Sequence, residues 1–283
     1  MALIQVNYVS AALMRTVTFQ AVIPADKITF PGMPEKEFRT FKTLYLLHGV
    51  FGNYTDWVSG TNIQRWAEKK DLAVIMPSGD NMFYVDQEGA HNHYGEFVGK
   101  ELVEFTRKLF PLSGRREDTF IAGLSMGGFG ALRNGLKYHE TFGRIAGLSS
   151  ALVTDTLSSR TNDTPVFIES RAYAESVFGD LEEAVESDKN PAFQAKKLAR
   201  EGKTLPQIYL ACGTEDSLLP ANRAFRDLLK EAGYPVTYEE GKGGHEWDFW
   251  NRYIRRVLDW LPLNEAEGGR FPYSLQQYRG LCG

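Results

Sequence analysis

Thr119-Phe-Ile-Ala-Gly-Leu-Ser-Met-Gly-Gly-Phe-Gly-Ala-Leu132 is the stretch of the chain that decides its fold. An apolar run leads into Gly123-x-Ser125-x-Gly127, and a segment suited to a helix follows, so we predict a strand, a sharp turn and a helix in that order. Such a turn holds the serine backbone in a sparsely populated conformation and presents its hydroxyl above the sheet edge. Because a Cβ two residues before or after the serine would clash, glycine is expected at both places, and both are glycine.

These glycines could instead form an ordinary turn that cradles a phosphate. No lysine follows them as a P-loop requires, and the Gly-x-Gly-x-x-Gly spacing is not met. A bare Gly-x-Ser-x-Gly motif is common by chance. It predicts catalysis only if an acid, a base and donors for an oxyanion occur in the right order.

Composition sets the broad class of the protein. With 283 residues, 43% of them hydrophobic, the chain can bury one large core, so we expect a single domain over 1–283. The net charge of −4 and the lack of a basic stripe argue against nucleic acid or an anionic membrane as a partner. No apolar run is long enough to cross a membrane, and the N-terminus lacks the pattern of a secretory signal, so a cytoplasmic location is predicted.

The candidate metal ligands are sparse. Cys212 and Cys282 form no metal or redox motif, and Cys212 is expected to be a small buried apolar residue. His91-Asn-His93 lacks an acidic or thiol partner at ligand spacing, so the two histidines are expected to be solvated. We predict neither a metal nor a cofactor.

The hydrophobic pattern predicts strands and helices that alternate along the chain. Two strands, 2–9 and 16–23, would form an antiparallel edge, and a loop over 24–42 follows. Further strands are expected at 43–47, 72–76, 119–124, 144–149, 206–212 and 236–240, and helices at 62–70, 96–110, 221–232 and 246–261. The polar segment 153–204, with helical pieces and no strand pattern, is predicted to be a cap insertion, although a surface insertion without function would look similar. Residues 264–283 are expected to be an irregular tail.

Three residues follow predicted strands in the order that a serine nucleophile, an acid and a base would take. They are Ser125, Asp216 and His245. Asp216 could alternatively cap a helix, and Glu215 and Asp248 are competing acids. We prefer Asp216, because a tight turn leaving a strand end is where the acid belongs in this topology. Glycines before His245 would let its loop bring the imidazole over the serine, whereas His139 is expected to lie on the surface.

A second glycine turn, His48-Gly49-x-x-Gly52, follows a buried strand. Beside the serine turn it could supply an oxyanion donor, the backbone N–H of Val50 or alternatively of Phe51, with that of Met126 as the second donor. His48 itself is expected to be structural. The aromatic residues near strand ends are candidates to line a substrate pocket; they are Phe51, Trp57, Phe83 and Tyr84.

Residues 15–261 are similar to the esterase D group of α/β-hydrolases, which includes tributyrin esterases, S-formylglutathione hydrolases and the acetyl xylan and feruloyl esterases of carbohydrate esterase family 1. The motifs that carry the similarity are Leu47-His48-Gly49, Gly52-Asn53, Asp56-Trp57, Met76-Pro-Ser-Gly-Asp80, Gly123-Leu-Ser-Met-Gly-Gly-Phe-Gly130, Gly213-Thr-Glu-Asp216 and Gly244-His245. The chain most resembles the short-chain tributyrin-type esterases.

This resemblance implies an α/β-hydrolase fold with a mostly parallel sheet of about eight strands, helices on both faces and a small helical cap. It also implies a triad of Ser125, Asp216 and His245, with Val50 and Met126 as oxyanion donors. The implied activity is that of a serine carboxylesterase acting on short acyl esters of small molecules, including acetyl or feruloyl esters of plant polysaccharide fragments. An S-formylglutathione hydrolase-type thioesterase is the alternative enzyme, and a non-catalytic binding module is the alternative from another class. Whether the protein is a monomer or a homo-oligomer stays open.

Overall fold

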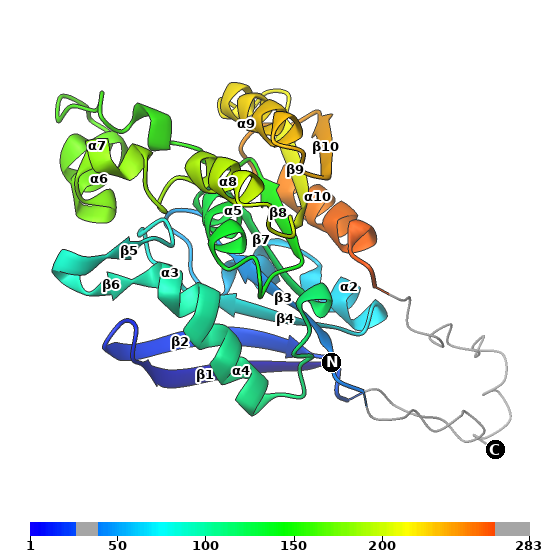
Figure 1. The fold of residues 1–283 in the computed structure, drawn as a ribbon. Helices are drawn as coiled ribbons and strands as arrows, with labels where there is room; N and C mark the ends of the chain where they lie inside the picture. The colour runs from blue at the N-terminus through cyan, green and yellow to red at the C-terminus, as the bar shows by residue number, and fades with distance from the viewer. Residues whose placement is uncertain (27–38, 264–283) are drawn as a thin grey trace, which may run out of the picture.

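An eight-stranded sheet runs through the centre of the computed structural model, which describes residues 1–26 and 39–263 (Figure 1). The strands lie in the order β1-β2-β4-β3-β7-β8-β9-β10. β2 pairs antiparallel with β1 and β4, whereas all the other neighbours pair in parallel. The strands are β1 (Ala2–Ser10), β2 (Arg15–Ile23), β3 (Lys42–Leu47), β4 (Leu72–Pro77), β7 (Thr119–Leu124), β8 (Arg144–Leu148), β9 (Gln207–Gly213) and β10 (Val236–Gly241). The predicted mostly parallel sheet is confirmed. The predicted tail at 264–283 and most of the predicted loop at 24–42 lie outside the described residues.

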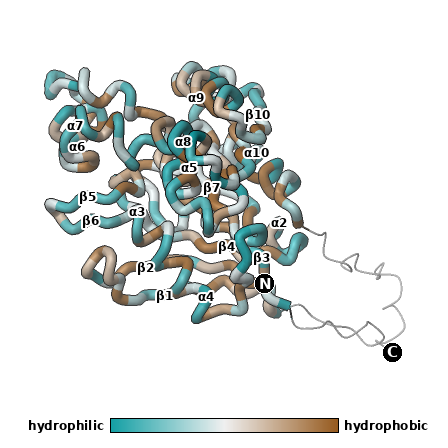
Figure 2. Tube along the Cα trace, viewed as in Figure 1, coloured by the Kyte–Doolittle hydropathy of each residue, from teal (hydrophilic) through white to brown (hydrophobic). Residues whose placement is uncertain are grey.

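Helices cover both faces of the sheet, and alternate side chains of each central strand enter one of two apolar cores. Tyr45 and Leu47 of β3 face the core made with α4 (Leu102–Leu109), α5 (Met126–Lys137), α8 (Pro191–Arg200) and α9 (Leu219–Glu231). Leu44 and Leu46 face the core made with α1 (Asp56–Gly60), α2 (Ile63–Lys69) and α10 (Trp247–Trp260). Burial on both faces explains why these strands are continuous apolar runs in the sequence. In Figure 2 hydrophobic residues recur along the sheet, while the small hairpin of β5 (Asp86–Gln87) and β6 (Asn92–His93) is mainly hydrophilic.

The helix predicted over 96–110 begins earlier and is not uniform. It consists of α3 (Tyr94–Glu96), a π-helical turn (Phe97–Glu101) and α4. Gly99 lies in the π-helical turn, where an added Cβ would lie 2.1 Å from the Tyr138 ring. The ring therefore fills the space that a side chain at this position would need. A glycine inside a helical pattern can mark an irregular turn, so Gly99 was the feature of the sequence that indicated one.

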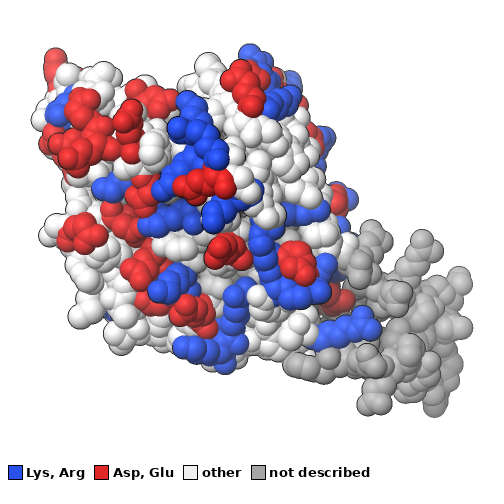
Figure 3. All heavy atoms as spheres, viewed as in Figure 1, with Lys and Arg blue, Asp and Glu red and all other residues white. Residues whose placement is uncertain are grey.

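The segment between β8 and β9 contains helices. Short 3₁₀ turns (Thr154–Thr156 and Phe167–Glu169) precede α6 (Arg171–Phe178), α7 (Leu181–Val185) and α8. Side chains of Ser170, Asp180 and Asn190 cap the starts of the three α-helices by accepting backbone N–H groups. Figure 1 shows α6 and α7 to one side of the molecule, and Figure 3 shows acidic side chains gathered over them.

The cap over 153–204 stays a prediction, and its last helix is α8. α8 packs against α5 and α9, so it belongs to the layer of helices on the sheet. Its buried residues, Ala195 and Leu198, lie in the same core as the β3 side chains. Buried residues of α6 and α7, among them Val177 and Leu181, lie in this core as well, so the segment packs on the sheet layer along its length.

Candidate active site

Ser125 lies at the sharp turn between β7 and α5, with φ 53° and ψ −119°. The two flanking glycines make this turn sterically feasible. A Cβ at Gly123 would lie 2.2 Å from the carbonyl oxygen of Gly127, and one at Gly127 would lie 2.4 Å from that of Leu47. The Ser125 N–H donates to the Leu148 carbonyl at 2.9 Å, which ties the strained residue to β8.

The structure brings Ser125, His245 and Asp216 into one hydrogen-bonded chain. His245 Nε2 is 2.9 Å from Ser125 Oγ, and His245 Nδ1 is 2.9 Å from Asp216 Oδ2. Because a carboxylate only accepts, Nδ1 carries the proton and Nε2 faces the hydroxyl as an acceptor. Asp216, and not the competing acids Glu215 and Asp248, is the acid placed against the imidazole.

The loops that carry the acid and the histidine form one unit. The N–H of Thr214 donates to the Gly241 carbonyl at 2.9 Å, and that of Glu215 to the Gly243 carbonyl at 3.0 Å. A Cβ at Gly213 would lie 2.1 Å from the Gly243 carbonyl oxygen, so glycine at this position permits the close contact. The position of the imidazole is therefore set by backbone contacts at the ends of β9 and β10.

The Asp216 carboxylate is buried but well satisfied. Its side chain is 0% exposed, whereas that of His245 is 37% exposed. Besides the imidazole, it accepts the Leu218 N–H at 2.9 Å. Burial by itself raises the pKa of Asp216, but the hydrogen bonds from His245 and Leu218 outweigh burial, so the pKa lies below its usual value. The carboxylate is thus ionised at neutral pH and can stabilise a positive charge on the imidazole.

Three tryptophan rings form a cluster that begins at the His245 imidazole. The Trp250 ring packs at right angles to His245, with centroids 4.9 Å apart, and Trp247 and Trp57 continue the cluster at 5.3 and 5.6 Å. The contact between Trp250 and the imidazole was not predicted from the sequence, which indicated only a helix over 246–261. Trp57 is 1% exposed, and its Nε1–H donates to the Leu47 carbonyl at 3.0 Å. It is a core residue, so its predicted place in a substrate pocket is wrong.

The loop after β3 lies against the serine turn. An added Cβ at Gly49 would be 3.4 Å from the Ser125 Cβ, which places the next residue, Val50, beside the nucleophile. His48 Nδ1–H donates to the Gly49 carbonyl at 2.6 Å, and His48 Nε2 accepts the Gly79 N–H at 2.8 Å. Burial lowers the pKa of His48, so the ring stays neutral in this arrangement.

These bonds also constrain the candidate oxyanion donor. The Gly49 carbonyl and the Val50 N–H belong to one planar trans peptide and point in opposite directions, so fixing the carbonyl fixes the N–H. The alternative donor, the Phe51 N–H, already donates to Asn81 Oδ1 at 2.8 Å. Met126 is the first residue of α5, where backbone N–H groups have no acceptor within the helix. Val50 and Met126 are therefore the donors that the geometry favours.

Two more residues predicted to line the pocket are buried in the core. Phe83 is 6% exposed and packs between Phe129 and Phe178, with centroids 5.3 and 5.4 Å away. Tyr84 is 0% exposed, and its hydroxyl donates to the His48 carbonyl at 3.1 Å. Both predictions are wrong, because the chain turns inward after β4. Phe51 is 76% exposed beside the oxyanion loop, and its contact with substrate stays a prediction.

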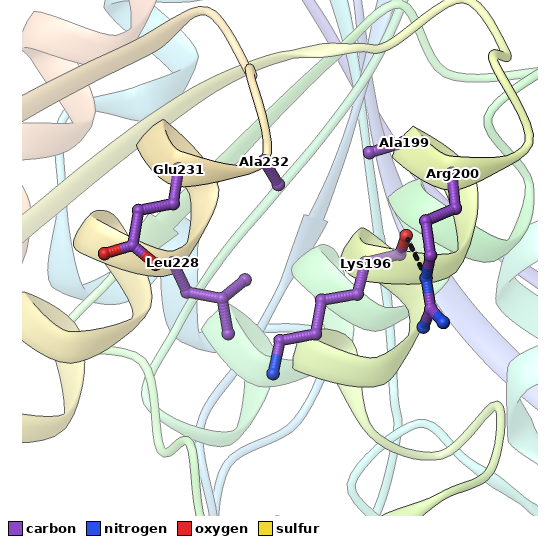
Figure 4. A pocket seen from close by; sticks show the side chains of 6 residues that line it. All are labelled: Lys196, Ala199, Arg200, Leu228, Glu231 and Ala232. Carbon is purple, nitrogen blue, oxygen red and sulfur yellow. Dashed lines mark hydrogen bonds between the residues drawn. The ribbon is translucent and has the colours of Figure 1, made fainter.

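Two cavities lie elsewhere, on either side of α8. One, of about 420 Å³, lies between α8 and α9, and Figure 4 shows Lys196 and Leu228 pointing toward each other across it. The other, of about 250 Å³, is lined by residues that include Lys137 and Asp188. Neither is lined by Ser125, Asp216 or His245, so neither adds to the candidate active site.

The remaining candidates do not form a site. His91 and His93 have ring centroids 4.5 Å apart. Across residues 1–26 and 39–263, no group of three or more His, Cys, Asp or Glu side chains is arranged to hold a metal ion. In the same part of the chain, no helix has the length and apolar character needed to cross a membrane.

A sheet of this strand order, with a serine on the strand–helix turn and an acid and a histidine after later strands, defines an α/β-hydrolase with a Ser-His-Asp site. The chain belongs to the Esterase family, whose model, described as "Putative esterase", matches residues 10–261. It is 45% identical over 267 residues to an acetyl esterase from Caldicellulosiruptor saccharolyticus, covering 92% of this chain and 98% of that one.

Solved structures agree with this assignment. An S-formylglutathione hydrolase from Staphylococcus aureus is 29% identical, with a TM-score of 0.78 over 92% of this chain and 98% of that one. A fluorophosphonate-binding serine hydrolase from the same organism is 30% identical, with a TM-score of 0.80 and the same coverage. A ferulic acid esterase shares the fold at 21% identity, with a TM-score of 0.70 over 92% of this chain and 97% of that one. The chain is a serine-type carboxylic ester hydrolase.

Proposed function

We propose that this esterase removes short acyl groups, acetyl foremost, from small-molecule esters, with Ser125 as nucleophile, His245 as base and Asp216 as the acid that orients it. The observation that carries the proposal is the unbroken chain from Ser125 Oγ through the imidazole to Asp216, with both contacts at 2.9 Å. A nucleophile, a base within hydrogen-bonding reach and an acid that fixes the base are the parts that acyl transfer requires.

In the proposed mechanism Ser125 Oγ attacks the ester carbonyl carbon while His245 Nε2 takes the hydroxyl proton. The carbonyl oxygen becomes an oxyanion and receives hydrogen bonds from the N–H groups of Val50 and Met126. The C–O bond to the alcohol breaks, and the imidazolium returns its proton to the departing oxygen. Water, activated by the same imidazole, then hydrolyses the acyl-enzyme and regenerates Ser125.

The preference for short acyl groups is supported by the 45% identity to an acetyl esterase along nearly the whole chain. Thioester hydrolysis of the S-formylglutathione type is the second candidate, because a hydrolase of that name is 29% identical and has the same fold. Both reactions need the same triad and differ in the leaving group. A single domain with a small cap, a cytoplasmic location and the assembly state stay predictions.

The test compares hydrolysis of acetyl, butyryl, octanoyl and feruloyl esters with hydrolysis of S-formylglutathione. We expect kcat/KM to be highest for the acetyl ester and to fall as the acyl chain lengthens. Ser125→Ala should lower kcat by about 10⁴-fold or more and abolish labelling by a fluorophosphonate, while the far-UV circular dichroism spectrum stays unchanged. A folded Ser125→Ala variant with wild-type turnover would overturn the triad, and a thioester preference would favour the second candidate.

A further inference from the structure

Two loops at the active-site edge are joined side by side, the oxyanion loop (residues 48–54) and the loop that follows β4 (residues 78–81). Three hydrogen bonds connect them: Gly79 N–H to His48 Nε2 at 2.8 Å, Phe51 N–H to Asn81 Oδ1 at 2.8 Å, and Tyr54 N–H to Ser78 Oγ at 3.2 Å. All three link the loop that carries Val50 to the end of β4. The orientation of the candidate oxyanion donor therefore depends on the neighbouring loop.

The bond from the Phe51 N–H to Asn81 holds a residue with a strained backbone. Phe51 has φ 66°, a left-handed conformation that is unfavourable for a bulky residue. Its side chain is 76% exposed, so little packing stabilises this conformation. Its N–H bond to Asn81 holds the peptide between Val50 and Phe51, which adjoins the peptide that carries the Val50 N–H. Without it, the loop should relax and the Val50 N–H should turn away from the reacting carbonyl.

Asn81 is also bonded to the predicted cap. The Tyr173 hydroxyl, from α6, donates to the Asn81 carbonyl at 2.5 Å. The Tyr173 side chain is buried, and burial raises its pKa to about 12, so the hydroxyl remains a donor at neutral pH. The Phe167 ring, which is 66% exposed, packs against the Tyr173 ring with centroids 5.0 Å apart. The side chain of Asn81 thus faces the oxyanion loop, while its backbone faces the cap.

We propose that Asn81 is a positioning residue that holds the oxyanion loop in its catalytic conformation and couples it, through Tyr173, to the cap. The inference rests on the proposed function, because it requires Val50 to be an oxyanion donor. It adds a residue whose effect should be seen in the transition state and not in ground-state binding. A substrate group that contacts the cap would then influence kcat through this link.

The first experiment measures kcat and KM for p-nitrophenyl acetate with Asn81→Ala. Complete loss of one oxyanion donor costs about 10²–10³ in kcat, so misalignment of the donor should cost about tenfold or more, with KM changed less than threefold. The affinity for a short alkyl trifluoromethyl ketone, whose adduct with serine carries an oxyanion, should fall by the same factor as kcat/KM. Asn7→Ala is the matched control, because it also removes an asparagine side chain that accepts a hydrogen bond, from Thr18 Oγ1 at 2.6 Å, but on the exposed edge strand β1, so it should alter kcat less than twofold.

The second experiment is a double-mutant cycle with Tyr173→Phe, which removes only the hydroxyl. Coupling through Asn81 predicts a smaller loss of kcat than in Asn81→Ala and no further loss in the double variant. If the losses of kcat in the two single variants add up in the double variant, the cap has no part in positioning the loop. An Asn81→Ala variant with wild-type kcat and wild-type ketone affinity would overturn the whole proposal. If that variant does not fold, Asn81→Ser, whose hydroxyl is one bond shorter, provides the same test.

The two proposals fail in distinguishable ways. If the wild-type protein neither hydrolyses the ester nor reacts with a fluorophosphonate, the proposed function fails before any variant is compared. If the wild-type protein turns over and Asn81→Ala matches it, only the inference about Asn81 fails. Thermal unfolding of each variant separates a local change in the loop from a general loss of the fold.

Discussion

Replacing Arg133 with methionine should lower the free energy of unfolding by about 3 kcal/mol. Arg133 lies on α5, and its side chain is 0% exposed. Its guanidinium donates to Asp188 Oδ2 at 2.7 Å, to the Asp188 carbonyl at 2.9 Å and to Asp86 Oδ2 at 3.0 Å. Breaking one partner of a buried ion pair costs about 3–5 kcal/mol. We expect the lower end of this range, because Lys137 still contacts both carboxylates and Asp188 is 40% exposed.

Urea unfolding followed by tryptophan fluorescence at pH 7 measures this loss. In thermal unfolding, the melting temperature should fall by about 6–12 °C, since each 1 kcal/mol shifts it by roughly 2–4 °C in a chain of this size. Lys197→Met is the matched control, because it also removes one positive charge but from an exposed pair with Glu201 at 4.0 Å. Such a pair contributes at most about 1 kcal/mol, so the control should stay close to wild type.

The pH dependence gives the sharper test of this reasoning. Burial raises the pKa values of Asp86 and Asp188, but Arg133 and Lys137 outweigh burial and leave both below the usual value. A carboxyl group with a lowered folded-state pKa contributes stability above its unfolded pKa of about 3.9, and this stability is lost as the pH falls through the folded value. The gap between wild type and Arg133→Met should therefore be largest at pH 7 and shrink below about pH 4. The reasoning would be refuted by a difference in unfolding free energy that is the same at pH 7 and below pH 4, or by a loss smaller than about 1 kcal/mol at pH 7.

Three further predictions concern the active site. Gly127→Ala should lower kcat for an aryl acetate by about 10² or more, because its Cβ would lie 2.4 Å from the Leu47 carbonyl oxygen; near-normal kcat would show that the turn can relax. His48→Leu should lower kcat about tenfold or more and reduce urea stability by about 1–3 kcal/mol, since the buried Gly79 N–H loses its acceptor; an unchanged kcat would separate His48 from the donor loop. Asp216→Asn should lower kcat by about 10⁴ without unfolding the protein, and a loss below tenfold would count against the assigned acid.

The serine turn and the meeting of Ser125, Asp216 and His245 were predictable because their signals are local or follow from topology. A strand, two glycines around Ser125 and a helix specify the sharp turn within a few residues. Asp216 and His245 follow later strands of the same parallel sheet, and carboxyl ends of parallel strands meet at one edge. The observed contacts of 2.9 Å join residues that are 120 and 29 positions apart. Their order along the chain, each after a predicted strand, carried this long-range information.

The burial of aromatic residues was not predictable in the same way. Phe83 and Tyr84 follow a strand end, a position that favours a pocket wall, but their φ values of 50° and 55° turn the chain inward. A Cβ at Gly79 or Gly130 would lie within 2.4 Å of the Tyr84 ring, so these glycines provide the space that the ring fills. Such pairings depend on which loop packs on which helix. The sequence shows the glycines and the ring without showing that they meet.

Strained backbone gathers at the same edge of the sheet as the triad. Phe51, Asp80, Ser125 and Ser149 all have positive φ, and they follow β3, β4, β7 and β8 respectively. Each such conformation costs about 1–3 kcal/mol and persists only where neighbouring groups hold it. Here the holding bonds run to a neighbouring loop or strand: the Phe51 N–H donates to Asn81 in the loop after β4, and the Ser149 N–H donates to the Ala211 carbonyl of β9 at 2.7 Å. Because the Phe51 N–H ties the oxyanion loop to the loop after β4, a change in either loop should alter the candidate oxyanion donor before it alters the core, so activity should be lost before the fold.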